Sequence, residues 1–299
     1  MASFAPPTIT PRNDLDFGLD ASVPRHWFGG DAFRTRLFDA LSLTFPEGER
    51  FFIACVRDFL PEVHTPQLRQ DVDRFTRQEV QHRQAHRDLN ARLASQGVKV
   101  DKIEAFQTHY LFDVCRRHLS ARHTLALTAA AEHLTAIMSQ HFFERPALFA
   151  DAAPRVRALL AWHAVEEVEH KGVAFDVLQQ VARGGYLLRS VALLNVTFNY
   201  MFQLATIINH MLKVDGFGRW QRWRLWARGL WWLWKPGGLL SPLLGAWLAW
   251  FRPGFHPWDT PMLPSFQRWA DTLARTGCPV AAANALQGEA AGVVAHVTP

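Results

Sequence analysis

The pattern Glu-x-x-His occurs twice in the chain, as QEVQH at residues 78–82 and as EEVEH at residues 166–170. Each copy lies in a stretch with helical spacing, where one acid and two histidines interrupt an apolar face. These residues are Glu79, His82 and His86 in the first stretch, and His163, Glu167 and His170 in the second. Burying isolated carboxylates is costly, and a divalent metal would remove that cost, since carboxylate and imidazole are ligands of first-row transition metals. The repeated pattern therefore predicts a metal site.

Two further glutamates suit the same site. Glu132 is the one acid in the apolar stretch LALTAAAEHLTAIMSQ, and Glu49 shares a helical face with apolar neighbours, although Glu47 and Glu62 compete with it. Di-iron carboxylate bundles combine Glu-x-x-His from two helices with one glutamate from each of the other two. The intervals between the four glutamates are short, long and short, which fits two antiparallel helix pairs joined by a long crossover. We therefore expect an all-α, ferritin-like four-helix bundle with a di-metal centre.

The sequence EEVEH resembles the Asp-Glu-x-x-His signature of ferritin-like di-iron oxygenases and of ribonucleotide reductase small subunits. This resemblance implies that Glu167 binds metal and that Glu166 supports the site without binding it. The spacing of His163, Glu167 and His170 is similar to that of p-aminobenzoate N-oxygenase, whose site has a third histidine. That similarity implies His163 as a ligand.

A longer stretch, from RHWFGGDAFRTRLFDALSLTFPEGERFF to WHAVEEVEHKGVAFDV, is similar to a bacterial family labelled predicted metal-dependent hydrolase. The label describes an inferred dependence on metal and does not establish hydrolysis. His86 departs from the N-oxygenase pattern. We expect it either to support His82 or to act as an extra ligand.

Helix start and stop signals divide the region before residue 185. Expected helices begin at Asp31, Pro46, Pro66, Asp101, Ser120 and Pro154. Pro46 is expected to separate two helices, and the helix with EEVEH to run to Gly184 and Gly185. This predicts an irregular segment over 1–25, a metal-binding bundle over 26–184, apolar and Trp/Arg-rich helices over 185–276, and a flexible tail over 277–299.

The C-terminal third contains two unusual stretches. Residues 190–208 are uncharged and long enough to span a membrane. However, Asn195, Asn199 and Gln203 recur along one face, so a helix packed on the bundle or lining its cavity is the alternative. Residues 219–252 interleave tryptophan with arginine in pieces too short to cross a bilayer. This composition is typical of peripheral membrane contact, and equally of a Trp-rich lid packed on the core.

Composition limits the remaining classes. The chain is 49% hydrophobic and 20% charged, which indicates a compact globular protein. Its net charge of +5 is modest, and no nucleic-acid-binding module is recognisable, so we expect no nucleic-acid partner. The three cysteines are isolated and the N-terminus has no apolar signal core, which favours the cytoplasm, including the inner face of the membrane.

The leading hypothesis is a non-haem di-iron oxygenase or oxidase that uses O₂ on a small hydrophobic substrate. We expect two iron ions, with Mn/Fe or Zn as alternatives, and an external electron donor, because no flavin or nicotinamide motif is visible. Hydrolysis by a metal-activated hydroxide and ferritin-like iron storage are the alternatives. Iron storage predicts a cage-like oligomer, whereas a homodimer is compatible with the two enzymatic hypotheses. The expected metal ligands, with Glu132 and Glu167 nearest the chemistry and His86 and Glu166 in support, are Glu49, Glu79, His82, Glu132, His163, Glu167 and His170.

Overall fold

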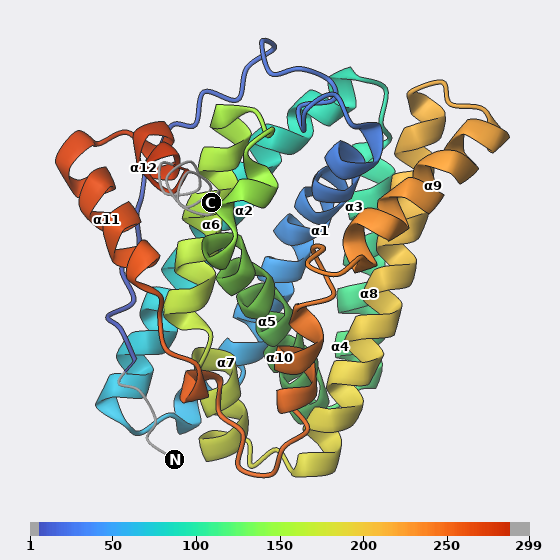
Figure 1. Ribbon diagram of the computed structural model, residues 1–299. Helices are drawn as coiled ribbons and strands as arrows, with labels where there is room; N and C mark the ends of the chain where they lie inside the picture. Colours follow the sequence, from blue (N-terminus) through green and yellow to red (C-terminus); the bar gives the residue numbers. More distant parts are fainter. Residues whose placement is uncertain (1–5, 288–299) are drawn as a thin grey trace.

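The computed structural model describes residues 6–287, which form helices and no β-strand (Figure 1). Four helices build the bundle: α1 (Ala32–Arg57), α2 (Pro66–Ser95), α5 (Ala121–Glu144) and α6 (Pro154–His170). Helix α1 packs on α2, and α5 packs on α6. The crossover between the pairs consists of α3 (Val100–Thr108), a π-helical turn (His109–Cys115) and α4 (Arg116–His118). The predicted all-α bundle is confirmed.

The helix starts follow the local signals in the sequence. The Asp31 side chain accepts a hydrogen bond from the Arg34 amide, and the Ser120 side chain accepts one from the His123 amide. Pro66 and Pro154 occupy the first positions of α2 and α6, where a missing N–H costs nothing. These caps fix where the metal-binding helices begin.

The prediction that Pro46 separates two helices is wrong, because α1 continues through it. Proline lacks the N–H that would bond the carbonyl four residues earlier, that of Ser42. The Asn90 side-chain amide of α2 donates to this carbonyl at 3.0 Å. Arg83 of α2 also donates to the Pro46 carbonyl at 3.0 Å. Helix α2 thus supplies the hydrogen bond that the proline removes.

The helix that carries EEVEH is also not continuous to Gly184. It is interrupted at Lys171 and Gly172, then resumes as α7 (Val173–Asp176) and a π-helical turn (Val177–Val181). Glycine is a weak helix former, and a Cβ on Gly172 would lie 2.6 Å from the indole nitrogen of Trp258. Lys171 donates to the Thr260 carbonyl, which holds the break in place.

The buried apolar residues of the bundle form two main clusters, one toward each end. Along α2, Leu68, Val72 and Phe75 belong to one cluster, whereas Leu89 and Leu93 belong to the other. The predicted metal ligands of α2 lie between these two groups. The same order holds along α1 and α5, whereas the apolar residues of α6 belong to one cluster and the other begins after its end, at Val173. The polar residues thus meet in a layer between two apolar regions.

Helix α8 (Tyr186–Val214) packs on α5 and α1 along one face and is exposed along the other. Among the described helices it alone has the length and hydropathy of a membrane span, a criterion that core helices also meet. Asn195 and Asn199 are exposed, and Asn199 donates to Asn195. Helix α8 therefore packs on the bundle, as one alternative predicted, but Asn195 and Asn199 do not line an internal cavity.

The chain then forms α9 (Arg219–Trp234), α10 (Leu243–Ala249), α11 (Pro264–Thr276) and α12 (Pro279–Ala285). Short 3-10 turns occur at Leu60–Glu62, Pro146–Phe149 and Pro257–Asp259. Helix α12 packs on α6 and buries Ala282 and Ala283. The flexible tail predicted over 277–299 is therefore wrong for residues 279–285, whereas residues 288–299 lie outside the described range.

Candidate metal centre

The four bundle helices bring all seven predicted ligands into one buried layer. Helix α1 contributes Glu49, α5 contributes Glu132, and α2 and α6 contribute the rest. None of these side chains belongs to a residue more than 5% exposed. The complete set is Glu49, Glu79, His82, Glu132, His163, Glu167 and His170.

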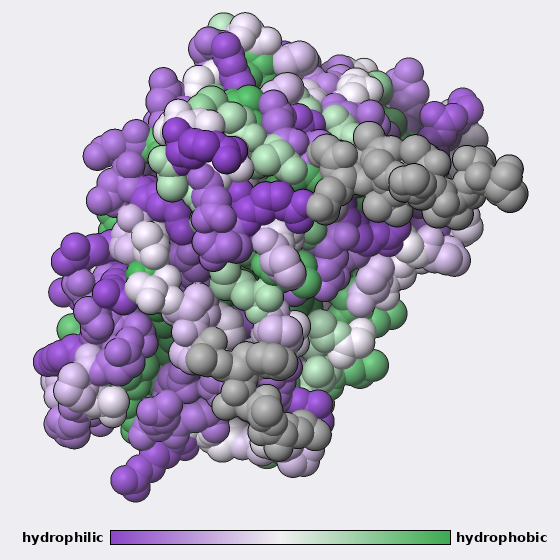
Figure 2. All heavy atoms as spheres, turned by 60° about the vertical axis from the view of Figure 1, so that its left-hand side comes forward, coloured by the Kyte–Doolittle hydropathy of each residue, from purple (hydrophilic) through white to green (hydrophobic). Residues whose placement is uncertain are grey.

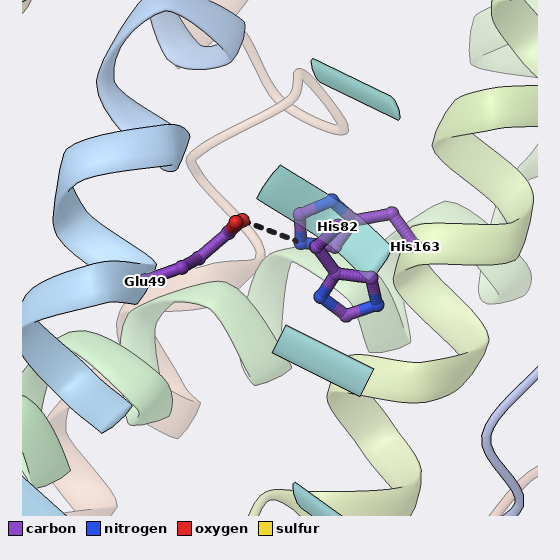
Figure 3. A group of neighbouring side chains, drawn as sticks. All are labelled: Glu49, His82 and His163. Atoms are coloured by element: carbon purple, nitrogen blue, oxygen red, sulfur yellow. Dashed lines mark ion pairs between the residues drawn. The ribbon is translucent and has the colours of Figure 1, made fainter. Parts of the chain in front are cut away.

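The ligand atoms fall into two groups, each with donor atoms within 4.8 Å of one another. The first contains Glu49, His82 and His163, which converge from α1, α2 and α6 (Figure 3). The second contains Glu79, Glu167 and His170.

Two glutamates extend and connect these groups. An oxygen of Glu132 lies 3.2 Å from His170 Nε2, which places Glu132 beside the second group. Glu167 Oε1 lies 3.0 Å from His163 Nε2 and 3.6 Å from His170 Nε2, so this carboxylate reaches both groups. The arrangement offers two adjacent sites with Glu167 between them.

Many polar atoms of this layer lack a hydrogen-bond partner among the described residues. Both carboxylate oxygens of Glu49, Glu79 and Glu132 accept no hydrogen bond, and His82 Nδ1 and His170 Nε2 have none either. Buried polar groups are normally paired, because leaving them unpaired costs free energy. Cations bound between the carboxylates and imidazoles would satisfy these atoms together. The residues present therefore fit a pair of metal ions.

A hydrogen-bond chain fixes the tautomer of His163. The Ser42 hydroxyl donates to Asn90 Oδ1 at 2.8 Å, so it accepts the N–H of His86 Nδ1, 2.9 Å away. His86 Nε2 is then an acceptor and receives the proton of His163 Nδ1 at 2.6 Å. Burial lowers the pKa of His86 well below its ordinary value, which keeps that ring neutral. His163 Nε2, which lies 3.0 Å from Glu167 Oε1 and 4.0 Å from Glu49 Oε1, is the ring nitrogen left to hydrogen-bond Glu167 or to bind a metal in place of that proton.

The two Glu-x-x-His helices support each other's histidines reciprocally. Glu166 of α6 accepts from His82 Nε2 of α2 at 3.2 Å, and Gln78 of α2 accepts from His170 Nδ1 of α6 at 2.8 Å. In each helix the supporting residue directly precedes the metal-site glutamate. Each histidine thereby keeps its other ring nitrogen free to bind metal.

The N-terminal segment contacts the residues that support the two histidines. Arg12 binds Glu166 at 3.2 Å and Glu169 at 2.6 Å, and the Gln78 amide donates to Glu169 at 2.9 Å. The Trp162 indole donates to Glu166 at 3.0 Å. These contacts hold the Glu166 carboxylate and the Gln78 amide in the orientations that their histidine partners require.

The pKa values reflect the crowding of acids. Burial, followed by the charge of Glu167, raises the pKa of Glu132 to about 7. Burial alone would lower the pKa of His170, but Glu167 and Glu132 outweigh it and raise the pKa to about 10. A proton on His170 thus offsets part of the negative charge, and a metal ion bound at Nε2 would displace it.

An apolar cavity of about 70 Å³ borders the centre. His163 and Glu167 form part of its wall. The α9–α10 connection contributes Leu239, α10 contributes Leu243, and α5 contributes Met138 and Ser139. The centre is therefore open on one side to a small space that suits apolar atoms.

One supporting residue differs from the sequence-based expectation, because His86 contacts His163 rather than His82. Glu169 is buried and supports the site through Gln78 and Arg12. Glu47, the competitor of Glu49, pairs with Arg50 and bonds Thr108, which leaves Glu49 as the glutamate of α1 at the centre.

Gln78 and Arg12 were not predicted. The position of Gln78 directly before Glu79, matching Glu166 before Glu167, is a signal that could have identified it. No comparable signal marks Arg12, because its segment has no regular structure and reaches the centre only through tertiary packing.

The fold and the donor set define a helical-bundle protein with a candidate His/Glu metal centre. A family model described as predicted metal-dependent hydrolase matches residues 10–260, and the chain belongs to this family. Membership indicates a metal-dependent enzyme and confirms the resemblance of the sequence to the predicted metal-dependent hydrolases. No curated protein and no solved structure matches the chain.

Proposed function

We propose that the protein is a non-haem di-iron oxygenase or oxidase acting on a small hydrophobic substrate. The observation that carries the proposal is the donor set: one glutamate from each of two helices and Glu-x-x-His from each of the other two, in a buried layer. Di-iron carboxylate bundles use this arrangement. The additional histidine, His163, is compatible with iron, which accepts imidazole ligands.

The chain's own residues would hold the metal ions, orient the substrate and shield the site from water. Glu49, His82 and His163 would hold one metal, Glu79 and His170 the other, with Glu167 between them and Glu132 beside the second. Iron bound there would supply the redox chemistry that O₂ activation requires, with electrons from an external donor. The apolar wall of the cavity would exclude water and place a hydrophobic substrate against Glu167. Manganese–iron or zinc occupancy would use the same ligands.

The test is metal analysis followed by oxygen measurement. Protein purified without added metal should contain about two iron ions per chain, and ferrous protein prepared without oxygen should consume O₂ when it is admitted. Glu167→Ala should abolish both, whereas Glu47→Ala, which removes a carboxylate of α1 outside the centre, should retain both. Zinc in place of iron, with no oxygen uptake after ferrous loading, would overturn the proposal.

Hydrolysis is the second candidate, favoured by the description of the family. Paired metals activate water for attack on esters, amides and phosphates. The same ligands would then hold zinc, and activity would be independent of oxygen. Turnover of a model ester by zinc-loaded protein under anaerobic conditions, absent in Glu167→Ala, would favour this alternative.

A further inference from the structure

The outer face of α8 is a continuous apolar stripe. Phe202, Leu187 and Phe198 are 77%, 74% and 69% exposed. Together with Val191, Leu194 and Met201 they recur at helical spacing, so they lie on one side of the helix. The opposite side, including Leu204 and Ile208, is buried. Helix α8 is thus anchored in the protein core while presenting large apolar side chains outward.

Helix α9 repeats this division. Trp220, Trp223, Trp231 and Trp234 are exposed, and their spacing places them on one side. The other side packs so closely that a Cβ on Gly229 would lie 2.2 Å from the Phe33 ring. The exposed tryptophans therefore do not cover the core, because the opposite side of α9, which contains Gly229, already packs on it.

The two stripes belong to one side of the molecule, where α8 and α9 lie next to each other (Figure 1). Helix α10 adds exposed Leu244 and Leu248, and its Trp247 indole donates to Thr197 of α8 at 3.0 Å. We call the exposed residues of α8, α9 and α10 the tryptophan surface. Elsewhere in the described chain the exposed large apolar residues are Val80, Phe106, Val114 and Leu119. Figure 2 shows a different face, where hydrophilic residues predominate.

The charge of the tryptophan surface has one sign. Arg219, Arg224 and Arg228 of α9 are exposed, and the described residues offer them no ion-pair partner. From residue 186 to residue 252 the one acid is Asp215. Its side chain is 1% exposed and pairs with Arg36 and Arg25, so it does not neutralise the surface.

We propose that the tryptophan surface docks on an anionic lipid bilayer, with α8 and α9 in the plane of the interface. Tryptophan and arginine are suited to this region, where rings reach the headgroup level and guanidinium groups meet lipid phosphates. Exposed cations without acids are complementary to anionic lipid. A second copy of the same surface fits less well, because a symmetric contact would bring the arginines of both copies together.

Docking in the interface also agrees with the packing of α8. Ile207, Ile208 and Met211 are buried in the core cluster that contains α1 and α6 residues. A helix that crossed the membrane would have to withdraw these side chains from the bundle. Lying at the interface buries the outer stripe while the inner contacts remain.

One wall of the cavity beside the metal centre is built from the same part of the chain as this surface. Leu239 belongs to the connection between α9 and α10, and Leu243 is the first residue of α10. A substrate dissolved in the bilayer would meet this connection before reaching Glu167. This second step rests on the proposed function, whereas docking itself does not require a metal.

Vesicle flotation of the full chain tests the docking. With phosphatidylcholine–phosphatidylglycerol vesicles, wild-type protein should float, and Trp223→Glu/Trp231→Glu should remain at the bottom. Phe106→Glu is the matched control, since Phe106 is 58% exposed on α3, and it should float like wild type. Arg224→Gln/Arg228→Gln should weaken binding about tenfold, in the way that added salt does.

The outcomes separate the alternatives. Failure of the wild type to float, or equal recovery of the tryptophan variant, would overturn the proposal, provided thermal unfolding shows both proteins folded. Conversion of a dimer to a monomer by Trp223→Glu/Trp231→Glu, with no flotation of the wild type, would instead assign the surface to a second copy. Because flotation needs no metal, loss of oxygen uptake with intact flotation would count against the proposed function alone.

Discussion

Two clusters of buried charge lie on the same helix, α1, and they are built differently. Near the start of α1, Arg36 pairs with Asp39 at 2.8 Å and with Asp215 of the segment after α8 at 2.5 Å. Trp27 donates to Asp39 as well. Farther along, Glu49 faces Glu167 and Glu132, which raise its pKa in addition to the larger effect of burial. Neither of its oxygens accepts a hydrogen bond.

The difference shows what each cluster needs from outside the chain. The Arg36 cluster contains its own counter-charges, so it is complete when the chain folds. The glutamate layer contains four carboxylates and no lysine or arginine among its ligands. Without metal its carboxylates can be neutralised only by protons taken up from outside the chain, and bound cations would replace those protons. The first cluster is therefore expected to contribute to stability alone, and the second to function at a cost in stability.

The largest expected effect comes from removing one carboxylate of the glutamate layer. Glu79→Gln should lose most of the bound metal and the activity. The substitution also removes a buried like charge. The free energy of unfolding of the metal-free variant should therefore exceed that of metal-free wild type by about 1–3 kcal/mol, and its unfolding temperature should be higher. Calorimetry of both proteins with and without a chelator measures this reversal.

Metal addition should then stabilise only the wild type, by about 3–4 kcal/mol when the free metal is several hundred times its dissociation constant. A metal-free Glu79→Gln protein less stable than metal-free wild type would contradict the view that this layer is an incomplete cluster.

The Arg36 cluster should respond in the opposite way. Asp215→Asn should cost about 3 kcal/mol at neutral pH, equally with and without metal, because it leaves Arg36 without its stronger partner. Burial would raise the pKa of Asp215, but Arg36 and His26 outweigh it and lower the pKa below its ordinary value of 3.8.

The pH dependence of this cost follows from the direction of that shift. A lowered folded-state pKa stabilises the protein above the unfolded value, and the stabilisation is lost as the pH falls through the folded value. The stabilities of wild type and Asp215→Asn measured by urea unfolding should therefore begin to converge as the pH falls below about 4. A constant difference down to pH about 3 would show that the charge of Asp215 is not responsible.

A smaller effect is expected from the residues that orient the histidines. Gln78→Leu and Glu166→Gln should each weaken metal binding about 10- to 100-fold, because each loosens the tautomer of a ligand histidine in the opposite helix. Gln84→Leu, on the exposed side of α2, is the matched control. Competition with a metal chelator gives the affinities, and an unchanged affinity in Gln78→Leu would remove the reciprocal support as a feature of the site.

The sequence was sufficient for the residues whose spacing is local. Helical periodicity placed Glu79 with His82 and Glu167 with His170. The free-energy cost of burying the four carboxylates separately implied that their helices converge. The caps at Asp31 and Ser120 are equally local, since each involves an amide three residues away. These features depend on contacts within one helix, which the order of residues determines directly.

Features that depend on contacts between helices could not be predicted in the same way. Arg12 reaches Glu166 across more than a hundred and fifty residues of chain, and Trp258 packs against Gly172 where the helix was expected to continue. Pro46 shows the same limit. Its usual effect is to end a helix, and the residue that prevents this, Asn90, lies on a different helix.

The smallest expected effect tests that compensation. In the wild-type background, Asn90→Ala should cost about 1–2 kcal/mol, because the Ser42 carbonyl is left buried without a donor. In a Pro46→Ala background the backbone N–H of residue 46 supplies that donor, so the same substitution should cost about 1 kcal/mol less. Urea unfolding of the four proteins measures this coupling. Additive effects, within about 0.3 kcal/mol, would mean that α1 tolerates Pro46 for some reason other than the Asn90 amide.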